Sequence, residues 1–411
     1  MKYQNNKTKI SSLLLIFAIF VCVSCNKDFE EPAAPTNPTS GQTIWQIINA
    51  GSNYTILKAA IARADSGQVG TSRIDSILNT NGNSLTLFAV DDNAFALSGI
   101  SPLVIAALPA TELQEILSYH IIPNALPSAS IPTTFPNTEM PTLLQLDPTN
   151  PLIRMNIFPW KNGAGNLYVN NIPVTTADQL ASNGVIHNVA AIVNPPSELL
   201  AQIIYGDPDL TYFTAAIARA DSGQVGLNKF DSLLKYPLVN MTVLAPTDSA
   251  FQAILYGEIY GALLQEGVPS GTAAAEAGAL SSSPTVFSNP ALYSVLTAAT
   301  VQGIVAYHIL AIQSDGSYQP VDRVFSVNFP TDPGQFVKTL VNASTVGQAH
   351  PGIMAQATFT GPFVTSLQFT GLGTFPPGGT PYSGGAANTI TFDEIGVNGV
   401  VHKIDKVLLP Q

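Results

Sequence analysis

Hydrophobic positions in residues 41–196 first follow a helical period. Apolar residues recur every three or four positions along Tyr54–Ala62, which predicts an amphipathic helix. A second helix is predicted to open at Thr111, where Thr-Glu-Leu-Gln has the pattern of a capping box, and to end before Pro123. Its apolar positions share one face, which predicts a buried stripe made of Leu113, Ile116, Leu117, His120 and Ile121. Tyr119 is expected to lie to the side of this stripe.

Other segments of the same region have the patterns of strands. Leu85–Val90 is continuously apolar and predicts a buried strand, followed by Asp91 or Asp92 as the N-cap of a short helix. Asn166–Val174 and Gly184–Val193 alternate between apolar and polar positions, which predicts further strands. The region therefore carries both helices and strands.

The pattern occurs twice along the chain. Residues 59–70 and 215–226 carry the same twelve letters, AAIARADSGQVG, 156 positions apart. Two later segments recur at offsets of 188 and 215, namely Ser118-Tyr119-His120 with Ala306-Tyr307-His308, and Asn183–His187 with Asn398–His402. A spacing this long excludes a short solenoid repeat and predicts two whole domains in tandem.

The growing offsets place two insertions in the second copy, near residues 254–300 and 346–390. We therefore expect one domain at 41–196 and an enlarged one at 197–411. Domains of this size bury enough surface to fold without disulfides or metals.

The composition limits the classes of partner. Charged residues make up 10% of the 411 residues and apolar residues 46%, a composition typical of exported proteins that contain β-structure. The formal net charge of −11 argues against nucleic-acid binding, because phosphates are neutralised by clustered Lys and Arg. It also argues against electrostatic docking on anionic lipid.

The N-terminus has the form of an export signal. Residues 1–24 contain a basic head, an apolar run too short to span a membrane and a small residue before Cys25. This segment resembles a bacterial lipoprotein signal, in which Cys25 receives the lipid; the alternative is an ordinary secretory signal. Residues 26–31 resemble an acidic signal for the outer face of the outer membrane, and the segment 25–40 ends in a Pro-rich spacer. We expect a protein anchored by lipid in the outer membrane and exposed at the cell surface.

Three ordered motifs resemble those of fasciclin domains, once in each half. They are the signature at Phe88–Phe95 and Leu244–Phe251, the two Tyr-His pairs, and the closing segments that begin at Asn183 and Asn398. The resemblance implies an α+β fold, in which each domain is a wedge-shaped β-sandwich with helices packed along one edge. It also implies a role in extracellular adhesion or matrix contact, without a cofactor.

The histidines are the first candidates for chemistry. Four of the five occupy matching positions in the two halves, but no Cys, HxH or HExxH pattern supplies the ligands of a metal site. We expect all four to point inward and to hydrogen-bond to backbone or to Tyr. In animal relatives the Tyr-His motif is associated with receptor binding. A binding role is therefore the second interpretation of Tyr119, His120, Tyr307 and His308.

The second insertion supplies aromatic candidates. Phe363–Phe369 alternates as a strand, and a Gly-rich loop follows it. Aromatic residues on such an insertion would form a contact patch at Phe363, Phe369 and Phe375. The alternative, which we prefer, is that Phe359, Phe363 and Phe369 close over the β-sandwich.

These features predict a non-enzymatic, lipid-anchored surface protein that binds a protein or a glycan for adhesion or assembly. No nucleophile elbow, phosphate-binding loop or dinucleotide fingerprint occurs, and no cofactor is expected. The alternative is an accessory glycan-binding subunit of an outer-membrane polysaccharide uptake complex. An enzyme with a carboxylate pair ranks third, because no pair stands out among the acidic residues.

Overall fold

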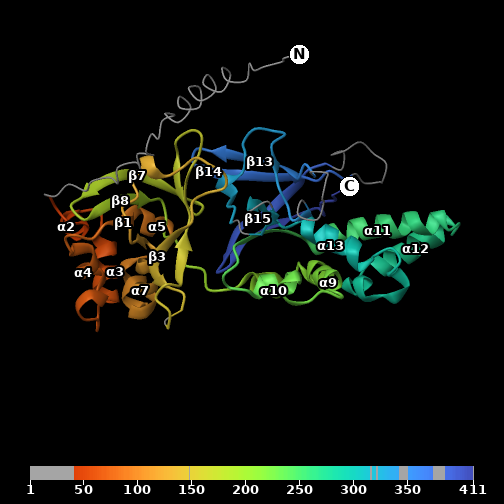
Figure 1. Cartoon of the computed structure of the whole chain (residues 1–411), viewed down its shortest axis with the longest axis horizontal. Coiled ribbons are helices and arrows are strands. Elements are labelled where there is room, and N and C mark those ends of the chain that lie inside the picture. Colours follow the sequence, from red (N-terminus) through yellow and green to blue (C-terminus); the bar gives the residue numbers. More distant parts are fainter. Residues whose placement is uncertain are drawn as a thin grey trace, which may run out of the picture.

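The computed structural model describes residues 41–147, 149–314, 317–320, 323–341, 350–373 and 385–410. Two halves of similar architecture follow one another along the long axis of the molecule, and in both of them most helices lie on one side of the strands (Figure 1). The candidate residues Cys25 and Phe375 lie outside the described residues.

The first half combines helices with two sheets. Its helices are α2 (Ile44–Ala50), α3 (Thr55–Ala64), α4 (Ile74–Asn79), α5 (Asp92–Leu97), α6 (Pro102–Ala107) and α7 (Ala110–Tyr119). Its strands are β1 (Leu85–Val90), β2 (Ile121–Ile122), β3 (Met140–Gln145), β4 (Arg154–Ile157), β5 (Pro159–Lys161), β6 (Leu167–Val169), β7 (Ile172–Ala181) and β8 (Gly184–Val189). Strand β3 pairs with β4, and the remaining strands form a six-stranded sheet with the order β2-β1-β8-β7-β6-β5.

The second half repeats this plan. Its helices are α8 (Leu200–Gly206), α9 (Thr211–Ala220), α10 (Phe230–Lys235), α11 (Asp248–Gln265), α12 (Ser270–Ser281) and α13 (Ala298–Tyr307). Its strands are β9 (Met241–Pro246), β10 (Ile312–Ser314), β11 (Ser317–Gln319), β12 (Phe336–Val337), β13 (Ile353–Thr360), β14 (Phe363–Thr370), β15 (Ala387–Gly396) and β16 (Gly399–Ile404). Its six-stranded sheet has the order β12-β13-β14-β15-β16-β9, and β10 pairs with β11. The expected α+β fold, present twice, is confirmed.

The closing motif of each half returns to the first signature. Strand β8 pairs in parallel with β1, which places His187 opposite Phe88. Strand β16 pairs in parallel with β9 and places His402 opposite Leu244. The predicted strand at Leu85–Val90 is confirmed, and Asp91 is the N-cap of α5, accepting a hydrogen bond from the backbone of Ala94. Motifs about 100 residues apart in the first half and about 160 apart in the second thus meet on neighbouring parallel strands.

The aspartate of the duplicated twelve-residue segment caps the next helix in both halves. Asp65 follows α3 and accepts hydrogen bonds from the backbone N–H groups of Ile74 and Asp75, at 2.6 and 3.1 Å, where α4 begins. Asp221 does the same for the first turn of α10, with both distances at 2.8–2.9 Å. The first N–H groups of a helix have no partner within the helix, so one carboxylate satisfies two of them and fixes the angle between the two helices.

The asparagine of each closing motif joins three segments of backbone. Asn398 is fully buried; its side chain accepts from the N–H of Leu200 at 2.8 Å and donates to the carbonyls of Leu234 and Tyr236 at 2.9 and 3.1 Å. Asn183 makes the equivalent set of bonds in the first half. The glycine that follows lies so close to the neighbouring strand that a Cβ on Gly399 would stand 2.2 Å from the carbonyl oxygen of Met241.

Two sequence predictions about the helices need correction. The predicted capping box at Thr111 is wrong, because α7 begins at Ala110 with Pro109 as a cap that makes no side-chain hydrogen bond. The helix also ends at Tyr119, so His120 is its C-cap and not a residue of its interior. The insertion near 254–300 forms a pair of packed helices, α11 and α12, which extend away from the first half in Figure 1.

The two halves share a small hydrophobic cluster. Phe158, Trp160 and Tyr168 of the first half pack with Phe325 and Val327 of the second, and all five side chains are buried. Figure 1 shows β14 beside the first half, and the hydroxyl of Tyr168 donates to the carbonyl of Pro362 in the turn that leads into it, at 3.0 Å.

Polar contacts surround this cluster. The guanidinium of Arg323, which is 3% exposed, lies over the ring of Phe158 at 4.8 Å from its centroid. The amide of Asn137 donates to the carbonyl of Arg323 at 2.6 Å and to the side chain of Asn328 at 2.9 Å. Because aromatic packing and partly buried hydrogen bonds both cross the junction, the two domains meet at a specific interface.

Candidate functional site

Each Tyr-His pair lies at the C-terminal end of a helix, α7 in the first domain and α13 in the second. The ring of His120 is buried; its Nδ1 lies 2.8 Å from the carbonyl oxygen of Ile116, and its Nε2 lies 3.1 Å from the backbone nitrogen of Val193. A carbonyl only accepts, so Nδ1 carries the proton and Nε2 accepts from Val193. Both nitrogens of the neutral ring are therefore used.

The second domain repeats this arrangement. Nδ1 of His308 donates to the carbonyl of Ile304 at 2.8 Å, and Nε2 accepts from the N–H of Leu408 at 2.9 Å. Burial lowers the pKa of both His120 and His308 to about 4, although the hydrogen bond to the carbonyl raises the pKa slightly. The expectation that these histidines are inward and bonded to backbone is confirmed.

The tyrosines are buried too, which overturns the expectation that Tyr119 lies to the side. Tyr119 and Tyr307 are both 0% exposed. The hydroxyl of Tyr119 donates to the carbonyl of Asn156 at 3.0 Å, and that of Tyr307 donates to the carbonyl of Gly352 at 2.7 Å. Each hydroxyl thus bonds to backbone within or next to a strand of the same domain. No part of either Tyr-His pair lies at the surface.

The histidines of the closing motifs have the opposite tautomer. Nε2 of His187 donates to the carbonyl of Leu126 at 2.9 Å, and Nδ1 accepts from the N–H of Asp178 at 3.1 Å. His402 bonds in the same way to Val324 and Asp393. Burial lowers the pKa of both histidines.

These contacts decide what the motif residues can do. A histidine with both nitrogens in backbone hydrogen bonds has neither a free base nor a free proton to offer a substrate. Within the described parts of the chain, no group of three or more His, Cys, Asp and Glu is placed to hold a metal ion. The four histidines shared by the two domains stabilise the fold.

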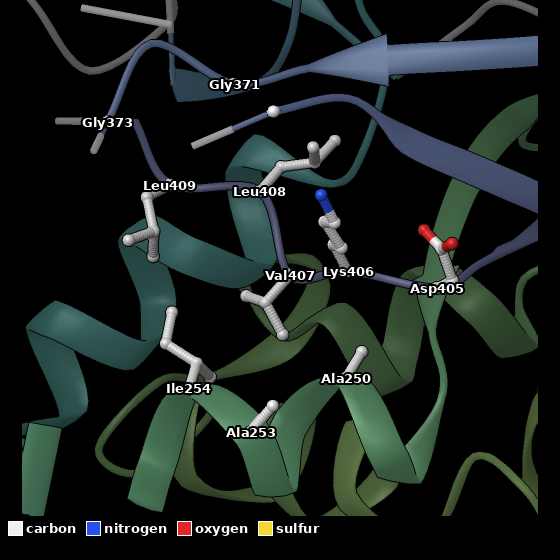
Figure 2. A pocket seen from close by; sticks show the side chains of 11 residues that line it. Ala250, Ala253, Ile254, Gly371, Gly373, Asp405, Lys406, Val407, Leu408 and Leu409 are labelled. Carbon is white, nitrogen blue, oxygen red and sulfur yellow. The ribbon is translucent and has the colours of Figure 1, made fainter. Parts of the chain in front are cut away.

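In the second domain the Tyr-His pair fixes the walls of a surface pocket. The hydroxyl of Tyr307 accepts from the N–H of Leu372 at 3.0 Å, and His308 holds Leu408. These two segments and one face of α11 enclose a cavity of about 260 Å³. Figure 2 shows Ala250, Ala253 and Ile254 on the helix, facing the segment that carries Val407.

This pocket has a largely apolar lining, with the side chains of Asp405 and Lys406 on its C-terminal wall (Figure 2). The backbone is tightly packed there, since a Cβ on Gly373 would stand 2.5 Å from the Cβ of Leu409. The Tyr-His pair therefore acts on this pocket only indirectly, by holding its walls in place.

The aromatic candidates of the second insertion divide between core and surface. The predicted strand at Phe363–Phe369 is confirmed as β14. Phe369 is fully buried and packs edge-on against Phe329, with ring centroids 5.1 Å apart, so it closes over the core. Phe363 is 56% exposed and remains available for contact. Phe359 is half-buried against the cluster between the domains.

A second cavity, which no sequence motif indicated, lies where the two domains meet. We call it the interdomain cleft and define it by Phe135, Trp160, Asn328, Phe336 and Phe359, which are among the residues lining its volume of about 530 Å³. Phe135 and Trp160 come from the first domain, and the other three come from the second. A cleft of this size is in the range of small-molecule sites, which span about 300–1,000 Å³.

Comparisons with known proteins find one matching family model and similar proteins. A family model described as the Fasciclin domain matches residues 66–195, within the first half. Protein sll1483 from Synechocystis sp. is 27% identical over 159 residues, which is 38% of this chain and 76% of that protein. A solved FAS1 domain pair from the insect cell adhesion molecule Fasciclin I aligns with 86% of this chain and 97% of its own at 13% identity, with a TM-score of 0.28.

Proposed function

Because the chain consists of two fasciclin-like domains in tandem, we propose that it is a non-enzymatic surface protein that binds a protein or glycan partner in adhesion or assembly. One observation carries this proposal. In both domains the ring nitrogens of the Tyr-His motif are bonded to backbone, so the residues that distinguish the domain build a scaffold and do not act on a substrate. Asn183 and Asn398, which open the closing motifs, also bond to backbone.

The proposed attachment to the cell is a lipid on Cys25, in the outer membrane and on its outer face. The lipoprotein-like signal that ends at Cys25 supports this proposal, and the Pro-rich spacer would hold the first domain off the membrane. Among the residues with described structure, no helix is both long enough and apolar enough to cross a membrane.

Anchoring and location are tested together on intact cells that produce the full chain. A radiolabelled fatty acid should mark the wild-type protein and leave Cys25→Ala unmarked. External protease should digest the wild-type protein on intact cells. Equal labelling of the two proteins, or digestion only after lysis, would contradict this part of the proposal.

The binding role needs a separate measurement. Cells that produce the wild-type chain should retain a surface partner after chemical cross-linking, and cells that secrete Cys25→Ala should lose that partner from the cell fraction. If cross-linking of intact cells captured nothing beyond neighbouring copies of the chain, a role in adhesion would be untenable.

The second candidate is an accessory glycan-binding subunit of a polysaccharide uptake complex. The aromatic lining of the interdomain cleft favours this candidate, since adhesion as such does not require a concave site of this size. Purification from detergent-solubilised outer membranes separates the two functions, because a transporter should accompany the protein only in the second case.

A further inference from the structure

We infer that the interdomain cleft binds a neutral glycan, gripping it between the two domains. This inference deepens the proposed function and rests on it, because it names the class of one partner and the place where that partner binds.

The first reason is the exposure of aromatic rings on both walls of the cleft. Phe135 of the first domain is 45% exposed and Phe336 of the second is 43% exposed, whereas most phenylalanines in the described ranges are buried. Leaving two such rings in water is unfavourable unless something covers them. Sugar rings offer flat faces of C–H groups with hydroxyls around the edge, and they pack against aromatic rings without removing those hydroxyls from hydrogen bonding.

The second reason is that two residues of the lining carry buried donors without a partner. Trp160 is 7% exposed and its Nε1–H has no hydrogen-bond partner among the described residues. Asn328 is 3% exposed, and its Nδ2 is likewise without a partner in that part of the chain. A buried donor left unpaired costs about 1–3 kcal/mol, so such groups are uncommon in a folded protein and point to an acceptor that is not part of the chain.

The orientation of the Asn328 amide is fixed by its neighbours. Its Oδ1 accepts from the backbone N–H of Phe325 at 2.8 Å and from the amide of Asn137 at 2.9 Å. Turning the amide over would set donors against donors, so Nδ2 remains the unpaired end. Two unpaired donors, one from each domain, require a ligand rich in acceptors, and hydroxyl oxygens meet that requirement.

The charge of the lining selects neutral glycans. Asp332 is the one charged side chain among the described lining residues, and the polar groups beside it are those of Asn162, Thr331 and Gln335. No lysine or arginine from the described chain lines the cleft to neutralise a carboxylate or sulfate. The net charge of −11 opposes polyanions as well.

An extended peptide fits the same cleft less well. Peptides often add to the free edge of a sheet through backbone hydrogen bonds. The edge strands that border the cleft are β5, with 3 residues, and β12, with 2 residues. Strands this short offer little backbone to pair with, and the unpaired donors of the cleft belong to side chains.

Affinity electrophoresis of the purified full chain tests the inference. Gels are loaded with one of four neutral polysaccharides (xyloglucan, laminarin, mannan or dextran) or with the anionic polygalacturonate. At least one neutral polysaccharide should retard the protein, and polygalacturonate should not. Phe336→Ala should weaken the retardation roughly tenfold, and Trp160→Phe, which keeps the ring but removes the N–H, roughly fivefold.

Tyr236→Ala is the matched control, because Tyr236 is an aromatic residue of the same domain that is 42% exposed, close to the 43% of Phe336, and it is not among the residues that line the cleft. It should migrate as the wild type does, and circular dichroism should show that all variants are folded. Unhindered migration through all four neutral gels overturns the inference. Retardation of Phe336→Ala equal to that of the wild type also overturns it, and so does loss of retardation in Tyr236→Ala. Since these gels contain no cells, their failure leaves the tests of surface location and partner capture unaffected.

Discussion

The histidines shared by the two domains predict that the protein loses stability in mild acid. Protonating His120 would place a new N–H at Nε2, directly against the backbone N–H of Val193 that now donates to it. The ring would also become charged in a fully buried position. His120→Gln should therefore make the first domain less stable at neutral pH, because the bridge between two backbone groups is altered, but also less sensitive to acid.

The magnitude follows from the two pKa values. The pKa of His120 falls from 6.5 to about 4 on folding, so the unfolded chain binds the proton more tightly. The stability that the neutral ring provides is fully present above pH 6.5 and is lost as the pH falls from there towards 4. At pH 5 the loss amounts to about 2 kcal/mol for this histidine, and the same holds for His308 in the second domain. His187 and His402, whose pKa values are lowered as well, add to the loss.

Urea unfolding at pH 7.5, 6.5, 5.5 and 5.0 measures this effect. Both tryptophans, Trp45 and Trp160, lie in the first domain, so their fluorescence reports the unfolding of that domain. The wild-type free energy of unfolding should fall between pH 7.5 and 5.0, and in His120→Gln the fall should be smaller by about 2 kcal/mol. His308→Gln is the matched control, and its fluorescence transition should keep most of the acid response. An identical pH dependence in wild type and His120→Gln would refute the reasoning.

Three further predictions concern the closing motif and the duplicated segment, each measured by urea unfolding at pH 7.5. Gly399→Ala should lower the free energy of unfolding by about 3 kcal/mol or more, because the new Cβ meets the carbonyl of Met241. Gly303→Ala, in a helix where the Cβ meets no other atom, should be neutral or stabilise by up to about 1 kcal/mol, and equal effects of the two substitutions would contradict the close approach at Gly399. Asn398→Ala removes the hydrogen bonds to one buried N–H and to two carbonyls and should cost about 3 kcal/mol; a loss under about 0.5 kcal/mol would show that the bridge is dispensable. Asp221→Ala uncaps α10 and should cost about 1–2 kcal/mol, and an unchanged midpoint would count against the role assigned to the twelve-letter repeat.

The sequence was sufficient to predict elements whose pattern is local and whose burial is one-sided. Leu85–Val90 and Phe363–Phe369 are strands as predicted, and His187 points inward because it shares the parity of its apolar neighbours. The duplication also predicted two domains of one fold, since the same motifs in the same order demand the same contacts. In these cases each residue's environment follows from its position within its own element.

The predictions from the sequence failed where a helix ends. A helical stripe drawn through His120 and Ile121 assumes that the helix continues, but α7 ends at Tyr119 and the chain turns into β2. Beyond that point the angular period no longer applies, and Tyr119 turns inward to donate to Asn156, which is 37 residues away on β4. A contact over that distance leaves no periodic trace in the sequence.

The interdomain cleft shows a further reason why a site can escape sequence analysis. Ser128 and Ser326 occupy equivalent places, since each donates its backbone N–H to an aspartate with positive φ, Asp178 in one half and Asp393 in the other. The residue before each serine is therefore equivalent as well, and it is Pro127 in the first half but Phe325, which packs at the junction, in the second.

The interface is thus heterologous, because each domain contributes a different face to it. A duplicated sequence marks the residues that both copies share, and these are the residues of the common core. The junction depends on positions where the copies differ, such as Phe325. The unpaired donors of Trp160 and Asn328 can be recognised only in the folded structure, because only there are the partners of all other polar groups known. For a tandem protein of this kind, the positions at which the repeat breaks down are consequently the first places to search for a binding site.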